Sequence, residues 1–442
     1  MATIREVGTP ASGNTNWYSH YQGMTDDVLR LHKDAIYLDA LGTGSDDTKL
    51  TAAMTAQQSN AGTSLNYPPI ILPNRPLSFT IPRSLYSGLK IVGPYGTGQK
   101  NPELAGGNYV GPEVTLGGTI GNGTSSWWNG TGSIYDVYMA DFSVQGSQGS
   151  GVHQFLDQPS GTLYACEFQS LSFNFMGGVF GNDSRKCLMT QVALTGSWTM
   201  NNAWGTQINA GGSDCIFFMD SFNNIGVSGS SAQTGSLTKY FLRLDSLEAQ
   251  IGKIYISTMN GWRGILISGA GTIIDMHGSI IEGFKPTRQN GLLSGPGPGS
   301  QVKITGGVVS MHGCKIGQGL DNPDVTEQGL LDISGGEVSL FGVNFYGANM
   351  DTGNGNAAAI YHTGGRLYAA GITKRQNITL AGRPRIITTA TAGTGAFTYY
   401  CPDGSLGDVP ITNQTQIPAG GTTGQALLKA TNTNYDVTWG AN

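Results

Sequence analysis

The sequence has 442 residues, of which 68 are glycine and 12% are charged, and its formal net charge at pH 7 is −5. Lysine and arginine form no cluster, which argues against nucleic acid or an anionic membrane as a partner. We find no run of about 18 apolar residues and no signal peptide, and therefore expect a soluble protein made in the cytoplasm, without membrane insertion.

Residues 1–40 contain no repeat but are unusually aromatic, with Trp17, Tyr18 and Tyr21 close together. Thr25 is a suitable N-cap for a short helix, because acidic residues fill the turn that follows it. The segment suits either an arm that packs on the rest of the chain or one that docks on another protein, and the sequence favours neither.

A second helix is expected from Ser45, where Asp46 and Asp47 fill the first turn and Leu50 and Ala53 follow at helical spacing. Short strands with Pro or Gly breaks come next, at 70–73, 77–81 and 89–93. An amphipathic helix that leads into strands can cover the open end of a solenoid, whose edge would otherwise pair with other chains.

The stretch from residue 39 to residue 93 resembles the start of the pectate-lyase-like β-helix superfamily, as found in bacteriophage tailspikes and tail fibres. The likeness lies in Gly-Ser-Asp-Asp-Thr at 44–48, Ile-Leu-Pro at 71–73 and Gly-Leu-Lys-Ile-Val-Gly at 88–93. Residues 39–44 are a degenerate form of the usual lead-in. The resemblance implies a right-handed, single-stranded parallel β-helix and a place in a phage tail.

Five tryptophans lie in or beside Gly, Asn and Ser turns rather than at alternating inward positions: Trp127, Trp128, Trp198, Trp204 and Trp262. Sugars bind to exposed aromatic rings beside polar side chains, so these five are candidate glycan-binding residues. For each one alone, packing in the core or between subunits is the commoner role. The long polar joints at 284–300, 317–329 and 347–356 form a second candidate surface, because successive joints of a solenoid emerge along one edge.

Four carboxylates lie within 35 residues on the less regular coils: Asp214, Asp220, Asp245 and Glu248. Hydrolysis of a glycosidic bond needs two carboxyl groups about 5 to 10 Å apart, and this group is the best place for such a pair. Asp275 and His277, two residues apart and both outward, are a further catalytic candidate, a base with its orienting acid, and His312 would stack on His277 in the next coil.

The stretch from Gly264 to Arg375 repeats one pattern four times. An alternating phrase that ends in glycine recurs at offsets of 35, 29 and 29 residues, as Ile274–Gly278, Val309–Gly313, Val338–Gly342 and Leu367–Gly371. A period in this range indicates a solenoid, and the alternation indicates strands. Aligning the phrases gives apolar inward columns and polar outward columns, as expected when like stacks on like in a parallel β-helix.

The same alignment predicts two ladder ion pairs, Asp332 with Lys303 and Glu337 with Arg366. A cation about 4.8 Å away favours the ionised carboxylate, which suits a structural pair better than a general acid. No cluster of acidic residues with a catalytic Arg or Lys, as calcium-dependent elimination would require, can be assembled from the sequence.

Residues 391–442 form a separate tail in which Gly420–Lys429 and Asp436–Trp439 resemble a short C-terminal element of phage tail proteins. Together with the N-terminal likeness this strengthens the assignment to a phage tail. Fibres of this kind are generally homotrimers, so the resemblance implies a homotrimer with 391–442 as its trimerisation or tip element.

The cysteine count is odd and shows no metal-type spacing, so we expect free and mostly buried thiols at Cys166, Cys187, Cys215, Cys314 and Cys401. We expect neither a metal ion nor another cofactor.

The expected architecture is all-β, with a tail-attachment segment at 1–40, a parallel β-helix with its capping helix at 41–390, and the tail at 391–442. The expected function is that of a tail fibre or tailspike subunit, assembled in the host cytoplasm and carried in the virion tail, that recognises a host cell-surface polysaccharide during adsorption. Its partners would be tail or baseplate proteins and that glycan. A polysaccharide depolymerase on the same fold, hydrolase or lyase, is the alternative, and a purely structural tail component is the third.

Overall fold

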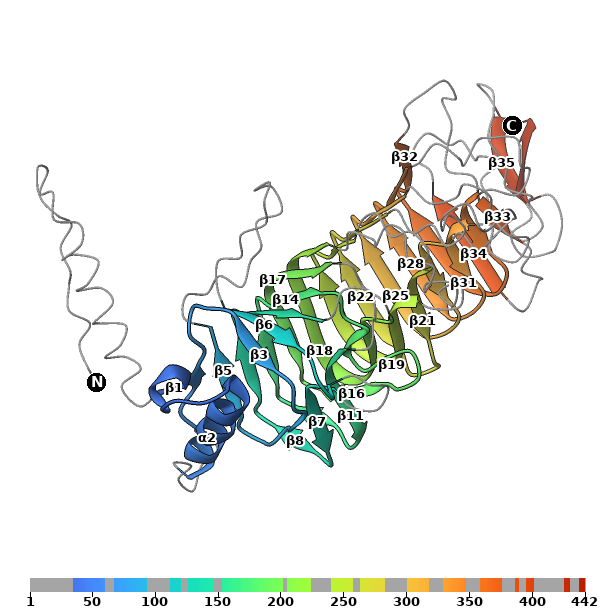
Figure 1. Ribbon diagram of the computed structural model, residues 1–442. Coiled ribbons are helices and arrows are strands. Elements are labelled where there is room, and N and C mark those ends of the chain that lie inside the picture. The colour runs from blue at the N-terminus through green and yellow to red at the C-terminus, as the bar shows by residue number, and fades with distance from the viewer. Residues whose placement is uncertain are drawn as a thin grey trace, which may run out of the picture.

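The computed structural model describes residues 35–59, 67–93, 112–120, 126–146, 153–201, 205–223, 240–256, 263–282, 300–317, 329–346, 358–375, 386–388, 395–400, 425–429 and 437–441. Most of these residues form a long rod of stacked strands, with helix α2 (Asp46–Ser59) and the short 3-10 helix η1 (Leu38–Ala40) at the N-terminal end (Figure 1). Neither helix has the length and apolar character needed to cross a bilayer.

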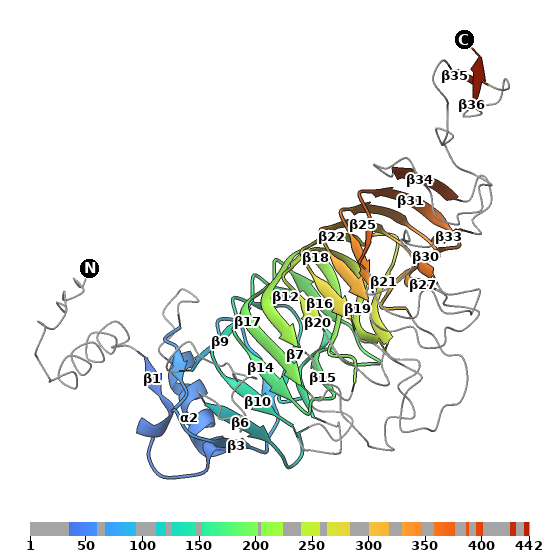
Figure 2. The same ribbon diagram turned by 90° about the horizontal axis from the view of Figure 1, so that it is seen from above.

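Strands of successive coils pair in parallel along the rod, so the chain is a parallel β-helix, as predicted (Figure 2). The strands of each coil lie on up to three faces. The first face contains β4 (Arg83–Ser84), β7 (Trp128–Thr131), β8 (Ile134–Tyr135), β11 (Gln154–Ser160), β12 (Leu163–Tyr164), β15 (Gly178–Phe180), β16 (Cys187–Thr190), the first halves of β18 (Ile208–Asn223) and β19 (Tyr240–Gly252), β21 (Arg263–Ser268), β24 (Val302–Ile304), β27 (Gly329–Ile333), β30 (Ala358–His362) and β33 (Ile386–Thr388).

The second face contains β1 (Ile36–Tyr37), β2 (Ile70–Ile71), β5 (Lys90–Val92), β9 (Tyr138–Ala140), β13 (Glu167–Gln169), the start of β17 (Ala193–Asn201), the later parts of β18 and β19, β22 (Ile273–His277), β25 (Val308–His312), β28 (Glu337–Phe341), β31 (Gly365–Ala370) and β34 (Gly395–Tyr400). The third face contains β3 (Leu77–Phe79), β6 (Glu113–Leu116), β10 (Ser143–Gln145), β14 (Ser172–Asn174), the end of β17, β20 (Tyr255–Ile256), β23 (Ile280–Glu282), β26 (Lys315–Gly317), β29 (Asn344–Tyr346) and β32 (Thr373–Arg375). Strands β35 (Gln425–Lys429) and β36 (Val437–Ala441) form an antiparallel hairpin.

The corners between faces are made by residues in the left-handed backbone region. Between the second and third faces of the regular coils these residues are the closing glycines of the repeated phrase, with φ of 57°, 61°, 62° and 63° at Gly278, Gly313, Gly342 and Gly371. A side chain in this region strains the backbone, which is why glycine recurs at the end of each phrase. In earlier coils the corner between the first and second faces falls on other residues: Asp136, Ala165, Gln191, Asp214 and Ser246.

One inward column of the second face runs unbroken through the rod. Each of its members pairs with the next and is at most 9% exposed: Ile36, Ile70, Ile91, Met139, Phe168, Leu194, Phe217, Ile251, Met276, Met311, Leu340 and Ala369. On the first face Ile267 pairs with Ile304, and Ile304 with Ile333, which confirms the predicted alignment.

Parallel pairing on the second face begins with Ile36 in β1 and continues to Tyr400 in β34.

The cysteine prediction is confirmed for Cys166, Cys187, Cys215 and Cys314, which are free and buried, while Cys401 lies outside the described residues. Burial raises the pKa of the Cys166, Cys215 and Cys314 thiols to about 11. These thiols are therefore protonated and inert at neutral pH.

Truncation of Met311 tests the inward column. We expect Met311→Ala to lower the free energy of unfolding by about 2–5 kcal/mol, because it leaves a cavity between Met276 and Leu340. Urea unfolding would measure this loss. Ser310→Ala, one residue away but outward, is the control and should change stability by less than about 0.5 kcal/mol; equal effects of the two changes would contradict the alternation.

Candidate functional site

The outward side chains of the second face form three parallel columns along β18, β19, β22, β25, β28 and β31. We call this surface the ladder face. Its columns, in coil order, are Glu248, Ile273, Val308, Glu337 and Arg366; Ile216, Gln250, Asp275, Ser310, Ser339 and Tyr368; and Phe218, Gly252, His277, His312, Phe341 and Ala370. Strand pairing sets the spacing between neighbours within a column, so the surface repeats along the rod at about 4.8 Å.

A row of rings runs along the ladder face. The His277 and His312 rings are stacked with centroids 4.9 Å apart, His312 is stacked on Phe341 at 4.9 Å, and Phe341 meets Tyr368 at 5.5 Å. The three stacked rings cover one another's faces and turn their edges outward, whereas Phe341 and Tyr368 are tilted by 51° and are 36% and 43% exposed. The tilt leaves aromatic surface at this end of the row for a ligand.

Gly252 precedes His277 in the third column and follows Phe218. A Cβ atom at Gly252 would lie 2.6 Å from the ring of Phe218. The absence of a side chain therefore makes room for that ring between its own coil and the coil of His277.

Asp275 lies beside both histidines. Its Oδ2 is 3.0 Å from Nε2 of His277, and its Oδ1 is 3.5 Å from Nε2 of His312. The predicted placement of Asp275, His277 and His312 on one surface is confirmed. With Nε2 of His277 directed at the carboxylate, Nδ1 is the ring nitrogen left for a ligand.

Exposed apolar side chains lie beside this polar cluster. Ile273 and Val308 face each other on adjacent coils and are 48% and 47% exposed. In the same column Glu248 precedes them and Glu337 follows. The ladder face thus combines an apolar strip with carboxylate, hydroxyl and imidazole groups, the combination that protein sites use to hold sugars.

The prediction that tryptophans face a glycan is wrong for Trp127, Trp128 and Trp198, which are fully buried. Trp127 is stacked on Phe79, with ring centroids 5.1 Å apart, and contacts Trp128 at 5.0 Å. Asn129 and Gly130 continue strand β7 beyond Trp128, and the indoles turn inward to fill the core.

Trp198 lies inside β17, where its Nε1 donates a hydrogen bond to the carbonyl of Thr195 at 2.7 Å. Trp204, Trp262 and most of the long joints proposed as a binding edge lie outside the described residues.

The predicted group of four carboxylates is not a single cluster. Asp245 ends the first face and binds Nζ of Lys186 at 2.9 Å, whereas Glu248 lies beyond the corner at Ser246, exposed on the ladder face. Burial would raise the pKa of Asp245, but the hydrogen bond and charge of Lys186 outweigh it and lower that pKa overall, which does not suit a general acid.

Asp214 and Glu248 lie on adjacent coils, where the register between β18 and β19 shifts. Asp214 is a corner residue with φ of 54°, and both side chains are exposed. The side chain of Asp220 lies outside the described part of the chain. A glycosidase needs one carboxyl group in a buried or strongly anionic setting. Asp214 and Glu248 are both exposed, so neither supplies a buried carboxyl group.

Both predicted ladder pairs have the expected register. Glu337 pairs with Arg366, and the charged groups lie 3.8 Å apart at the surface. Lys303 pairs with Asp332, which is only 2% exposed.

Sequence reasoning missed two features near the ladder face. Phe341 and Tyr368 extend the histidine row, and the alignment that placed His312 over His277 contained this signal. On the third face Glu282 accepts hydrogen bonds from the hydroxyls of Tyr255, at 2.9 Å, and Tyr346, whose ring crosses over Gly317. The contact between Glu282 and Tyr346 joins strands two coils apart, and no repeated residue type in the sequence predicts it.

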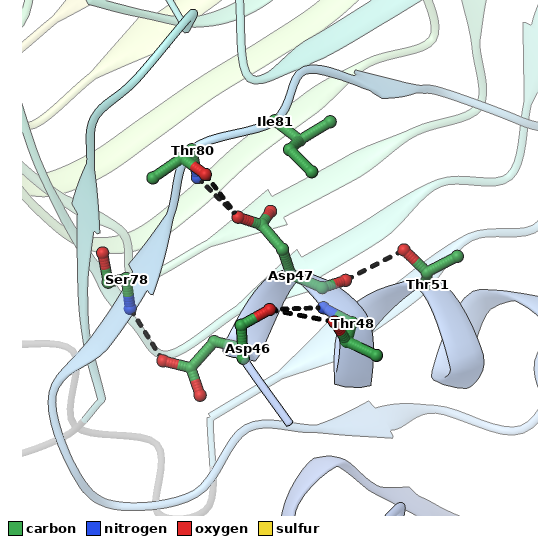
Figure 3. Close-up of a pocket in the computed structure, with 8 residues that line it drawn as sticks. Asp46, Asp47, Thr48, Thr51, Ser78, Thr80 and Ile81 are labelled. Atoms are coloured by element: carbon green, nitrogen blue, oxygen red, sulfur yellow. Dashed lines mark hydrogen bonds between the residues drawn. The ribbon is translucent and has the colours of Figure 1, made fainter. Parts of the chain in front are cut away.

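A hollow of about 460 Å³ at the start of α2 is a second place to look for a site (Figure 3). Its carboxylates already have partners: Asp47 accepts hydrogen bonds from the Thr80 backbone N and Oγ1 at 2.9 and 2.7 Å, and Asp46 accepts one from the Ser78 backbone N at 2.9 Å. Asp47 also forms a buried ion pair with Arg83 at 2.7 Å. These contacts fasten the capping helix to the first coils, so we assign the hollow a structural role.

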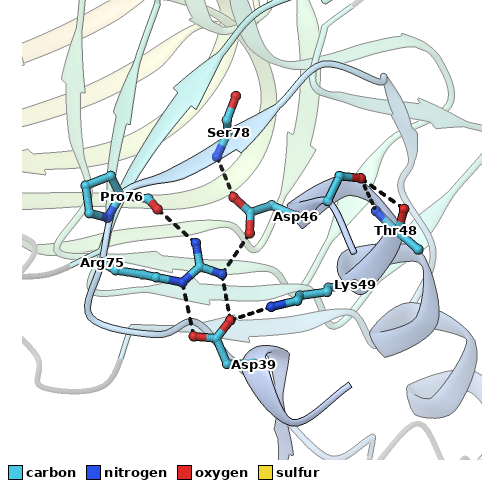
Figure 4. A network of polar contacts seen from close by, with 8 residues as sticks. Asp39, Asp46, Thr48, Lys49, Arg75, Pro76 and Ser78 are labelled. Atoms are coloured by element: carbon cyan, nitrogen blue, oxygen red, sulfur yellow. Dashed lines mark hydrogen bonds and ion pairs between the residues drawn. The ribbon is translucent and has the colours of Figure 1, made fainter. Parts of the chain in front are cut away.

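The neighbouring network at the cap has the same role (Figure 4). Arg75 binds Asp39 at 2.6 Å and Asp46 at 2.8 Å, and Lys49 binds Asp39 at 3.0 Å. The hydrogen bond from Arg75, followed by the contact with Lys49, lowers the pKa of Asp39 to about 2 against the opposing effect of burial. Within the described residues no group of three or more His, Cys, Asp or Glu side chains is arranged to hold a metal ion.

The sequence matches no protein-family model and no curated protein. Solved structures similar to it include the A-module of Azotobacter vinelandii mannuronan C-5 epimerase AlgE4 (12% identity, 87% of this chain and 100% of that one, TM-score 0.41) and the Dettilon tailspike protein (10%, 83% and 70%, 0.44). A tailspike of E. coli bacteriophage HK620 in complex with a pentasaccharide is also similar (13%, 84% and 67%, 0.38). At these identities and TM-scores none of them assigns a function to this chain.

The Asp39 network predicts a pH dependence of stability. Because the folded-state pKa of Asp39 is lowered to about 2, its contribution is complete above the unfolded pKa near 3.8 and is lost as the pH falls towards 2. We expect Asp39→Asn to destabilise by less than about 1 kcal/mol at neutral pH and low salt, since the carboxylate is 44% exposed. Urea unfolding from pH 6 to pH 2 would show the difference between variant and parent shrinking; a difference that grows on acidification would contradict the assignment.

Proposed function

We propose that this chain is the receptor-binding subunit of a phage tail, a tail fibre or tailspike, and that it binds a host cell-surface polysaccharide with the ladder face. The observation that carries the proposal is the repetition of the ladder face, where rings, hydroxyls and carboxylates recur along the rod. The likeness of residues 39–93 and of the C-terminal tail to phage tail proteins supports the assignment to a tail.

A repeating surface suits a repeating ligand. A linear polysaccharide can lie along the columns, with its apolar ring faces over Ile273 and Val308 and near Tyr368, and its hydroxyls towards Asp275 and Ser310. Several weak contacts of this kind add along one polymer, so the affinity does not require a deep pocket.

The remaining assignments follow from the tail role. Residues 1–40 would attach the subunit to tail or baseplate proteins, and residues 391–442 would join three copies or form the tip. Assembly would take place in the host cytoplasm, and the mature location would be the virion tail.

Cleavage of the polysaccharide is the second candidate, and the carboxylates of Asp214 and Glu248, on adjacent coils, are what favour it. Binding is preferred because both groups are exposed to solvent. Incubation with a polysaccharide that the protein binds, followed by assays for new reducing ends and for unsaturated sugars, decides the question; either product would establish a depolymerase.

Loss of rings from the ladder face should weaken glycan binding. We expect the double change His312→Ala and Tyr368→Ala to reduce affinity roughly tenfold, since each removes part of the aromatic row. An array of bacterial surface polysaccharides would identify a ligand and titration would give the affinity. Tyr135→Ala is the matched control, because Tyr135 is also exposed and stacked, on Tyr164, but lies on the first face. Equal losses in both proteins, or binding unaffected by either change, would place the ligand elsewhere.

A trimer should be present in solution. Light scattering from the purified full-length chain is expected to give three times the chain mass of 46.4 kDa. A version truncated before residue 391 should lose this mass if the C-terminal tail joins the subunits. A monomeric full-length chain would contradict the trimer.

A further inference from the structure

We infer that the ladder face takes a glycan without acidic groups, built from neutral sugars or from sugars with free amines. The inference rests on the proposed function and specifies the chemical class of the polysaccharide that the ladder face would bind. It excludes polymers of uronic acids and polymers that carry phosphate.

The charges on the ladder face are mostly negative. It carries three carboxylates, those of Glu248, Asp275 and Glu337, and a fourth, that of Asp214, lies at the corner that borders it. The one guanidinium, that of Arg366, lies 3.8 Å from Glu337 and offsets only that charge. Asp214 and Glu248 occupy neighbouring coils and have no ion-pair partner among the described residues. Like charges repel each other, so a surface that carries these carboxylates disfavours a further anion and favours a cation.

Basic side chains lie at the border of this surface. Lys253 and Lys315 are exposed at and just beyond the corner between the second and third faces, and Lys303 belongs to the first face. A polymer that follows the columns therefore passes over the carboxylates, with the lysines to one side. The imidazole rings within the columns, those of His277 and His312, both face Asp275.

The ladder face offers strong acceptors in its carboxylates, beside hydroxyl and amide groups that can both donate and accept. The carboxylates accept only, and a neutral imidazole that directs its protonated Nε2 to Asp275 offers Nδ1 as a second acceptor. Hydroxyl and ammonium groups of a sugar can donate to them. A carboxylate or phosphate on the ligand has no hydrogen to donate and would add a negative charge to the same place.

The apolar strip fits the same class of ligand. Ile273 and Val308 are nearly half exposed and lie between Glu248 and Glu337 in one column. The C–H face of a neutral sugar ring, or the methyl group of an acetylated amine, can cover this strip while the hydroxyls reach the flanking carboxylates. An acidic substituent would be held against two like charges.

The test uses the full-length protein and an array of bacterial surface polysaccharides and oligosaccharides in three classes: neutral, amine-bearing, and uronate- or phosphate-bearing. At low salt we expect ligands of the first two classes to bind at least tenfold more tightly than acidic ligands of equal length. Added salt should weaken the binding of amine-bearing ligands and reduce the difference in affinity between them and acidic ligands, because it screens exposed charges.

Charge removal provides the matched comparison. The double change Glu248→Gln and Glu337→Gln should improve binding of acidic ligands several-fold at low salt and weaken that of amine-bearing ones. Glu113→Gln, a carboxylate on the third face, should change neither.

The outcomes separate this inference from the function on which it rests. An acidic polysaccharide that binds tightly, and whose binding is lost in the His312→Ala and Tyr368→Ala protein, would overturn the inference and leave the proposed function standing. Failure of all three classes to bind would count against the proposed function itself.

Discussion

The register of the inward column governs the rest of the structure. Met311 pairs with Met276 and Leu340, and this apolar stack continues from one end of the rod to the other. A slip by one residue would bury His312 and expose Met311, exchanging the core for the surface along the whole strand. The register that stabilises the core therefore also places His312 between His277 and Phe341 on the ladder face.

How well the alignment of the strands can be predicted from the sequence depends on which residues form the corners. Where glycine supplies the left-handed residue, as at Gly278 and Gly313, the phrase ends visibly and the alignment of the strands could be predicted correctly. In the earlier coils the same conformation falls on residues such as Ala165 and Gln191, which carry no such signal. The strands of the earlier coils pair in the same way, although no repeated phrase marks their alignment.

The errors at the candidate sites have the same origin. Asp245 and Glu248 are three residues apart in sequence, yet the corner at Ser246 puts them on different faces. Asn129 and Gly130 have the composition of a turn but belong to strand β7, and their composition does not predict the direction of the Trp127 indole, which packs against Phe79. Alternation predicts which residues share a side but not what covers that side: Asp332 is at an outward position of the repeat and is nevertheless 2% exposed.

The charges of the ladder face also bear on how three copies would associate. In a closed trimer whose axis runs along the rod, residues at the axis meet their own copies at the same height. With the ladder face at the axis, Glu248 would meet two further Glu248 side chains, and each remaining carboxylate of that face would do the same. This arrangement is unfavourable without a cation, so the ladder face should point away from the axis, and the surface that repels its own copies is the surface left free for a glycan.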